Sequence, residues 1–131
     1  MRFCSFASGS SGNCALVSCA DVNILIDAGI SMRRISAALG RYGLGFGDLD
    51  GILVTHEHAD HIAGLRMIAK YHAVPVYAPS TVARRLSGAV PGIEDCLRSV
   101  EKGSAFFLKD LSVLAFATSH DIRSLVFFPT K

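Results

Sequence analysis

The stretch from Thr55 to His61 holds the densest group of metal-binding side chains in the sequence. It reads Thr-His-Glu-His-Ala-Asp-His, so three of the chain's five histidines fall within one short segment, together with two carboxylates. Neutral imidazole nitrogens and carboxylate oxygens are the ligands that zinc and similar ions take. In an extended loop alternate side chains point the same way, so His56 and His58 can share one ion, and Asp60 and His61 can reach a second ion beside it. The pattern therefore favours a metal site over a solvated loop that is rich in histidine.

The elements on either side of this stretch would place it where a strand ends and a helix begins. Residues 51–54 are a short apolar run typical of a buried strand. Residues 62, 65, 68 and 69 are apolar, which is the spacing of one helix face over residues 62–70. Loop side chains converge beyond strand ends in α/β folds, so this junction is a common address for a site.

The rest of the chain continues the alternation of strands and helices. Ser31 is a good N-cap for a helix that ends near Gly40, and Ser80 begins another helix that Gly88 ends. Lys109-Asp110 is a two-residue link of the kind that joins the strands of a hairpin. The further strands that we expect are 2–7, 14–18, 22–26, 76–78, 99–100, 105–108 and 111–117. Short strands followed by helices, and then a hairpin, indicate an α/β layer fold.

Three motifs give the chain a resemblance to a known family. The spacing His-x-His-x-Asp-His, at residues 56–61, resembles the signature of the metallo-β-lactamase fold superfamily. The segments Phe-Ala-Ser-Gly-Ser-Ser-Gly-Asn (6–13) and Ile-Leu-Ile-Asp-Ala-Gly (24–29) look like the opening of its YycJ/WalJ-like branch, whose members resemble RNA- and DNA-processing nucleases. The resemblance implies an αββα sandwich of two sheets with helices outside. Residues 1–131 would be the N-terminal part of that single domain, covering roughly its first half.

The resemblance also assigns roles to individual residues. It implies that His56, His58 and His120 bind a first metal ion, since His120 occupies the Thr-x-His position in which the family carries its third histidine. Asp60 and His61 would bind a second ion, and Asp60 would also orient the attacking water as a catalytic residue. Asp27 would support the ligands from behind, although an aspartate at a strand end is also often a turn cap. His72 lies past the end of a helix and is left out of the site.

The expected activity is that of a metal-dependent hydrolase. The resemblance implies one or two zinc ions, with manganese as the alternative, and a phosphodiesterase or nuclease that attacks nucleic acid with a metal-activated water. The alternatives are a hydrolase of a small ester, thioester or lactam, and a metal-binding or interaction module without catalysis. The Gly-rich loop 8–13 lacks a P-loop lysine and is expected to be a turn rather than a phosphate cradle.

The sequence departs from the family pattern after His120. The family carries a later aspartate that bridges both metals and one more histidine, but residues 122–131 contain neither an acid nor a histidine. Either the chain is a part that lacks its C-terminal half, which we favour, or it pairs as a homodimer that buries an exposed sheet face. We therefore expect residues 1–131 alone to be a poor catalyst.

Composition sets the remaining limits. The chain has 131 residues, half of them hydrophobic, with a mean hydropathy of +0.40, a net charge of +2 and a pI near 8.4. No apolar run has the length that a membrane span needs, so no membrane partner is expected. The four cysteines form no Cys-x-x-Cys pair and the N-terminus lacks a secretory signal, so we expect a cytoplasmic protein.

Overall fold

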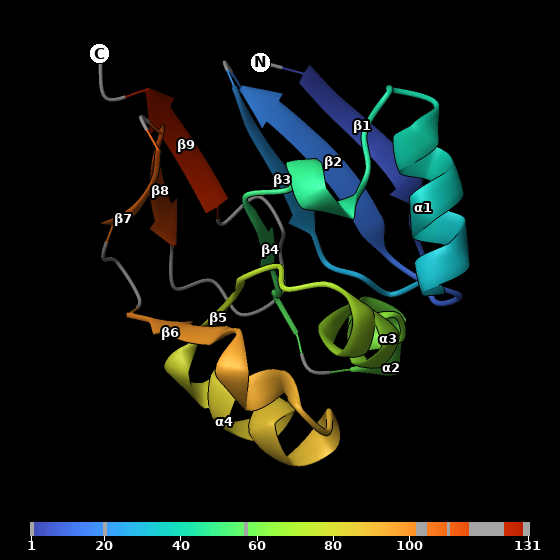
Figure 1. The fold of residues 1–131 in the computed structure, drawn as a ribbon. Coiled ribbons are helices and arrows are strands. Elements are labelled where there is room, and N and C mark those ends of the chain that lie inside the picture. The colour runs from blue at the N-terminus through green and yellow to red at the C-terminus, as the bar shows by residue number, and fades with distance from the viewer. Residues whose placement is uncertain are drawn as a thin grey trace.

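A six-stranded mixed sheet organises the first hundred residues (Figure 1). A computed structural model of the chain describes residues 2–19, 21–56, 58–101, 105–109, 111–115 and 125–129. The strand order follows the chain, with antiparallel pairing from β1 to β3 and parallel pairing from β3 to β6. The strands are β1 (Arg2–Ala7), β2 (Cys14–Cys19), β3 (Val22–Ile26), β4 (Gly51–Leu53), β5 (Val76–Pro79) and β6 (Leu97–Val100).

Helices cover one face of this sheet (Figure 1). They are α1 (Met32–Gly40), α2 (Ala59–Ile62), α3 (Leu65–Tyr71) and α4 (Ser80–Ala89), with short 3₁₀ turns η1 (Phe46–Asp48) and η2 (Ile93–Asp95). Alternate strand residues point to opposite faces, and the set that faces the helices forms the main core with them. From the strands this core takes Leu16, Leu25, Ile52 and Val76, and from the helices Ile35, Leu39, Leu65, Ile68 and Leu86.

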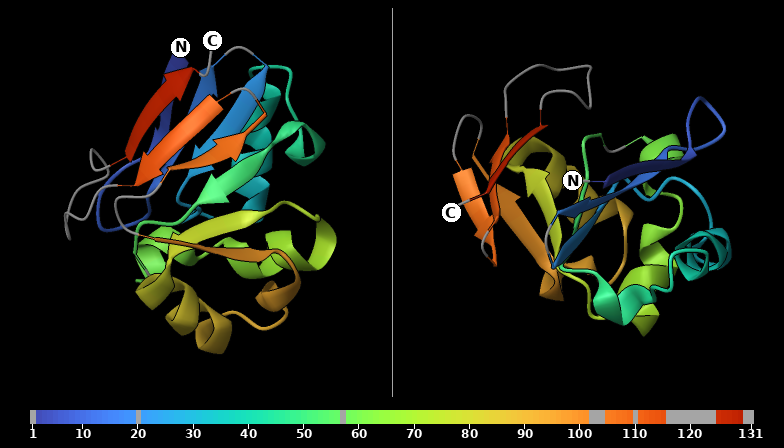
Figure 2. Two further views of the ribbon diagram at one scale, coloured as in Figure 1. Left: turned by 90° about the vertical axis from the view of Figure 1, so that its left-hand side faces the viewer. Right: turned by 90° about the horizontal axis from the view of Figure 1, so that it is seen from above.

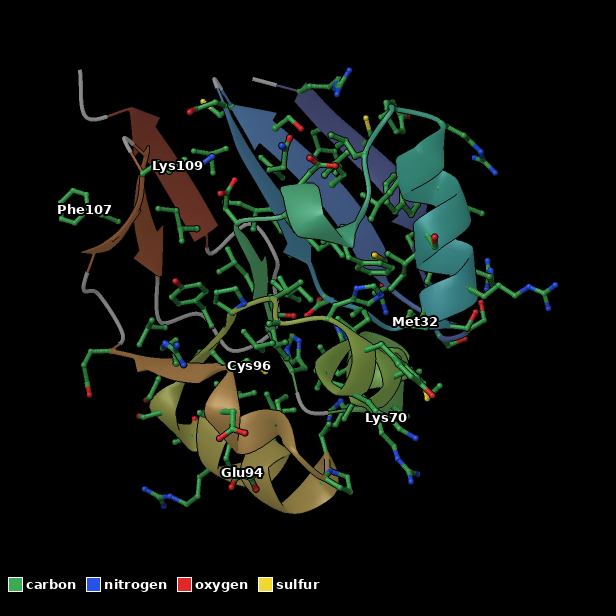
Figure 3. The ribbon with its side chains drawn as sticks, viewed as in Figure 1. Met32, Lys70, Glu94, Cys96, Phe107 and Lys109 are labelled. Atoms are coloured by element: carbon green, nitrogen blue, oxygen red, sulfur yellow. The ribbon has the colours of Figure 1, made fainter. Side chains whose placement is uncertain are left out.

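A second sheet lies on the other face of the first (Figure 2). It consists of β7 (Ala105–Leu108), β8 (Leu111–Ala115) and β9 (Leu125–Pro129), all antiparallel. Leu108 packs with Val22, Ile24 and Leu53, which are buried on the face away from the helices. Lys109, in the β7–β8 turn, reaches back to the first sheet with its Nζ 3.2 Å from Asp50 Oδ1 (Figure 3). The layers are thus helices, sheet and sheet, which confirms the α/β class and the order expected for the first half of a four-layer sandwich.

The expected strands and helices are present, but the structure adds β9, which was not predicted, and α4 continues past Gly88 to Ala89. Ser31 caps α1 as predicted, its Oγ accepting from Arg34 N at 3.2 Å, and the Lys109 turn joins β7 to β8. The helix expected over residues 62–70 starts earlier and breaks at Gly64. The N–H of Gly64 donates to Ala28 O at 2.8 Å, and a Cβ on Gly64 would collide with Ile30 O. The break therefore comes from close packing of a distant segment, which helical periodicity cannot reveal.

Candidate metal centre

The parallel pairing of β3 with β4 brings the site together. Ile26 lies opposite Leu53, so the residues that follow each strand emerge side by side at one edge of the sheet. Asp27 follows β3, and the segment of residues 55–61, which we call the metal loop, follows Val54 and includes the first residues of α2. The N–H of Asp27 donates to Leu53 O at 2.7 Å, which fixes the start of both loops together.

Asp27 is fully buried behind the metal loop. It has a positive φ of 62°, a conformation that aspartate and asparagine adopt more readily than most residues. Its Oδ1 accepts from Thr55 N at 2.8 Å, and its Oδ2 accepts from Thr55 Oγ1 at 2.7 Å. The same Oδ2 lies 2.7 Å from His61 Nδ1. The carboxylate therefore occupies a special turn position and also contacts two residues of the metal loop.

This contact fixes the state of His61. Because Asp27 accepts, the ring proton sits on Nδ1 and the lone pair of Nε2 remains available to a cation. The hydrogen bond to Asp27 raises the pKa of His61, as do the negative charges of Asp27 and Asp60, while partial burial works in the opposite direction. A metal and a proton would therefore compete for the same Nε2.

Two donor atoms of the metal loop lie at a distance that suits ligands of one shared metal ion. His61 Nε2 lies 3.6 Å from Asp60 Oδ2. Two ligand atoms that bind one tetrahedral ion at about 2.0–2.2 Å are roughly 3.3–3.6 Å apart. The His56 ring centroid lies 4.7 Å from that of His61 and 6.0 Å from that of His58.

These distances leave the donor set incomplete within the part of the chain that the structure describes. No three His, Cys, Asp or Glu side chains there converge closely enough to hold an ion together. His120, the expected third histidine of the first ion, lies outside the described residues. His72, which we left out of the site on its sequence position, is the C-cap of α3 and stacks on Phe46 at 4.4 Å between ring centroids.

Asn13 is a site residue that sequence reasoning missed. The loop 8–13 is a turn, with Gly12 N donating to Gly9 O at 3.2 Å, as predicted. Its last residue, however, also clamps the metal loop: Asn13 N donates to Asp60 O at 2.7 Å, and Asn13 Nδ2 lies 3.1 Å from Asp60 O and 3.2 Å from Asp60 Oδ2. The amide thus holds both the backbone and the carboxylate of Asp60. A polar amide at the end of a Gly-rich turn was the only sequence signal for this role.

Gly29 lets the backbone after β3 pack closely against Asp60 and Asn13. A Cβ at this position would overlap the carbonyl of Asp60 and lie 2.7 Å from Asn13 N. Gly29 N in turn donates to Asn13 O at 2.8 Å. The loops after β1 and β3 therefore close on the metal loop as one packed unit.

A pocket of about 580 Å³ opens over these residues. One wall is strand β1, whose Phe3 side chain is exposed. The lining residues are Phe3, Ser5, Ala7, Ser8, Asn13, Cys14, Ala15, Asp27, Thr55, His56, His58 and His61. Burial, and then the charge of Asp27, raise the pKa of the Cys14 thiol to about 12. Cys14 therefore stays protonated at neutral pH and is no nucleophile, in line with its place in the main core.

Comparisons with known proteins agree with this geometry. Residues 22–127 match the family model for the beta-lactamase superfamily domain. The chain is 36% identical over 131 residues to exodeoxyribonuclease YycJ of Bacillus anthracis, covering 98% of this chain and 49% of that protein. It is 29% identical over 130 residues to exodeoxyribonuclease WalJ of Streptococcus pneumoniae, covering 97% and 48%.

Solved structures show the same arrangement of elements. A B3 metallo-β-lactamase with an active-site glutamic acid superposes with a TM-score of 0.71 and 25% identity, covering 84% of this chain and 47% of that one. The chain thus spans about half the length of the curated relatives it matches. Among the described residues, no helix is long and apolar enough to cross a membrane.

Proposed function

Because the chain belongs to the beta-lactamase superfamily, we propose that it forms the metal-binding part of a hydrolase that cleaves phosphodiester bonds in nucleic acid. The observation that carries the proposal is the buried Asp27 carboxylate, which orients His61 so that its Nε2 faces the Asp60 carboxylate. A carboxylate behind a histidine is the arrangement that prepares an imidazole for a metal.

The metal ligands are proposed in two sets. His56, His58 and His120 would hold one ion, and Asp60 with His61 would hold part of the coordination of another. Zinc suits a set rich in imidazole, and manganese is the alternative. When bound, such an ion supplies Lewis-acid activation of the substrate and lowers the pKa of a water.

Hydrogen bonds within the chain hold the proposed ligands in position. Asp27 Oδ2 holds the proton on His61 Nδ1, and Thr55 ties the start of the metal loop to the same carboxylate. Asn13 restrains the Asp60 carboxylate, which we propose orients the attacking water. Each of these contacts joins loops that follow different strands, so the site is organised by the fold and not by the metal alone.

The choice of nucleic acid over a lactam rests on the relatives. The two curated relatives described above are exodeoxyribonucleases, whereas the solved metallo-β-lactamase is 25% identical. Hydrolysis of a small ester, thioester or lactam is the alternative within the same chemistry. We also propose a cytoplasmic location for the protein.

A second candidate is a metal-binding module that does not catalyse. The observation in its favour is that the chain spans about half the length of its curated relatives. This candidate predicts metal binding without turnover.

Two measurements on the 131-residue chain test the proposal. Metal analysis after purification in zinc- or manganese-containing buffer should find bound metal that His58→Ala loses, with His72→Ala as the matched control. Single-turnover assays with excess protein should then show faster cleavage of bis(p-nitrophenyl) phosphate and nucleic acid than of a chromogenic lactam. Equal, negligible metal in wild type and His58→Ala would overturn the metal site, and faster lactam cleavage would overturn the substrate class.

A further inference from the structure

The basic residues of this chain are unevenly distributed. Residues 28–47 and 61–93 together hold seven of the 13 Lys and Arg residues and none of the 11 Asp and Glu residues. These two stretches contain α1, α3 and α4, which cover one face of the first sheet, together with strand β5 of that sheet. The small net charge of +2 therefore conceals a helical layer that is positive and a remainder that is negative.

Two of these helices lie next to each other and beside the metal centre. The first turn of α1 follows directly on Asp27–Ile30, and α3 follows directly on α2, which carries Asp60 and His61. The two segments meet where Gly64 packs against Ile30 and Ile35. Figure 3 shows Met32 at the end of α1 nearest to α3, and Lys70 on α3.

The exposed side of these helices combines charge with apolar surface. Arg33 and Arg34 on α1, and Arg66 and Lys70 on α3, all have exposed side chains. Among the described residues, none of the four forms an ion pair with a carboxylate. Met67 and Tyr71, which are also four residues apart on α3, form a second exposed row beside Arg66 and Lys70. Their side chains are 42% and 57% exposed. We call Arg33, Arg34, Arg66, Lys70, Met67 and Tyr71 the basic face.

Solubility alone does not explain this face. Two like charges four residues apart on a helix oppose each other, and a neighbouring acid would ordinarily relieve them. The Lys70 Nζ instead lies over the Tyr71 ring, 5.3 Å from its centroid. Cations beside an open aromatic ring are the combination that single-stranded nucleic acid uses, since phosphates pair with the cations and bases stack on the ring.

We propose that the basic face binds a single strand of nucleic acid and guides it toward the metal centre. Arg33, Arg34, Arg66 and Lys70 contact successive phosphates, and Tyr71 stacks on a base. This inference deepens the proposed function, because it adds a binding surface to the proposed nuclease. It is independent of the metal ligands, so the two can fail separately.

Fluorescence anisotropy with a labelled oligothymidylate of about 20 nucleotides tests the face directly. The 131-residue chain is titrated in EDTA at about 50 to 200 mM salt, where cleavage is blocked and counterion release is measured. Each phosphate contact contributes about 0.7 to the slope of log affinity against log salt. Arg66→Glu/Lys70→Glu should therefore lower that slope by about 1.4 and weaken binding at least about tenfold. Tyr71→Ala should weaken binding about fivefold with the slope unchanged.

The matched control reverses the same number of charges elsewhere. Arg84→Glu/Arg98→Glu changes two exposed arginines on α4 and β6 and should leave affinity within about twofold. Thermal melting of every variant, and the milder Arg66→Ala/Lys70→Ala, separates lost binding from lost folding. Equal losses in the two charge reversals, tighter binding to duplex than to single strand, or binding only to vesicles of anionic lipid would each overturn the inference. Lost binding with retained metal supports the basic face without bearing on the metal site.

Discussion

Substitution of Asp27 by asparagine would separate the charge of this residue from its shape. Asparagine has the same size and also tolerates the positive φ of 62° found here, so the backbone turn should survive. The remaining carbonyl oxygen can still accept from Thr55 N, which Asp27 now holds at 2.8 Å. The amide NH₂, however, must occupy the other position, next to Thr55 Oγ1 and His61 Nδ1.

The consequence for His61 is a change of tautomer. A donor opposite Nδ1 favours the lone pair on that nitrogen and places the ring proton on Nε2, the atom that faces Asp60. Substitution of a carboxylate that orients a metal-ligating histidine typically costs about 10–100-fold in metal affinity. We expect a loss in this range for Asp27→Asn, together with a destabilisation of about 1–2 kcal/mol, because charged hydrogen bonds are replaced by neutral ones.

Asp27→Ala should be worse, because it adds a backbone penalty of about 1–2 kcal/mol and leaves the Thr55 N–H without its acceptor, at about 1–3 kcal/mol more. Asp21→Asn is the matched control, because it removes the same charge from a carboxylate that is 73% exposed and lies outside the site. Zinc affinity by competition with a chromophoric chelator measures the first effect. Long-range ¹H–¹⁵N NMR of the imidazoles reads the tautomer directly. Unchanged zinc affinity together with a proton still on His61 Nδ1 would refute the reasoning.

Three further predictions follow from the packing and the titration of the site. Gly29→Ala should cost about 1–3 kcal/mol in denaturant unfolding, because its methyl group would overlap the backbone of the metal loop, whereas Gly40→Ala, with open space around it, should cost nothing; equal stabilities would contradict this close approach. The hydrogen bond to Asp27 raises the pKa of His61 above 6.5. In EDTA the pair of protonated His61 and Asp27 should therefore stabilise the fold fully below pH 6.5, and this stabilisation should be lost as the pH rises through the raised pKa. The fall in stability between pH 6 and pH 8.5 should therefore shrink in Asp27→Asn, and an identical pH profile would count against the pair. Native protein at pH 8 should leave Cys14 unmodified by iodoacetamide, since burial raises its pKa to about 12, and labelling should require denaturant; rapid labelling of the folded chain, read by peptide mass spectrometry, would show the thiol to be accessible.

Many of the strands, helices and turns could be predicted from short segments of the sequence. The apolar run before the metal loop, the Ser31 cap of α1 and the two-residue turn at Lys109 each depend on a few neighbouring residues, and each has its expected structure. The family resemblance likewise rests on short motifs, and residues 22–127 match the family model. Such features are predictable because backbone propensity, capping and hydrophobic periodicity act over one or two turns of chain.

Only the tertiary structure decided how the site is held. The carboxylate of Asp27 reaches His61 across 34 positions of sequence, and the amide of Asn13 reaches Asp60 across 47. The break at Gly64 has the same origin, since its N–H leaves the helix to bond the segment after β3. Each contact depends on the register of β3 against β4 and on how closely three loops can pack beyond the strand ends. A pattern of residue types records which side chains could bind a metal, but the choice of hydrogen-bond partner depends on distances in space, which local sequence does not specify.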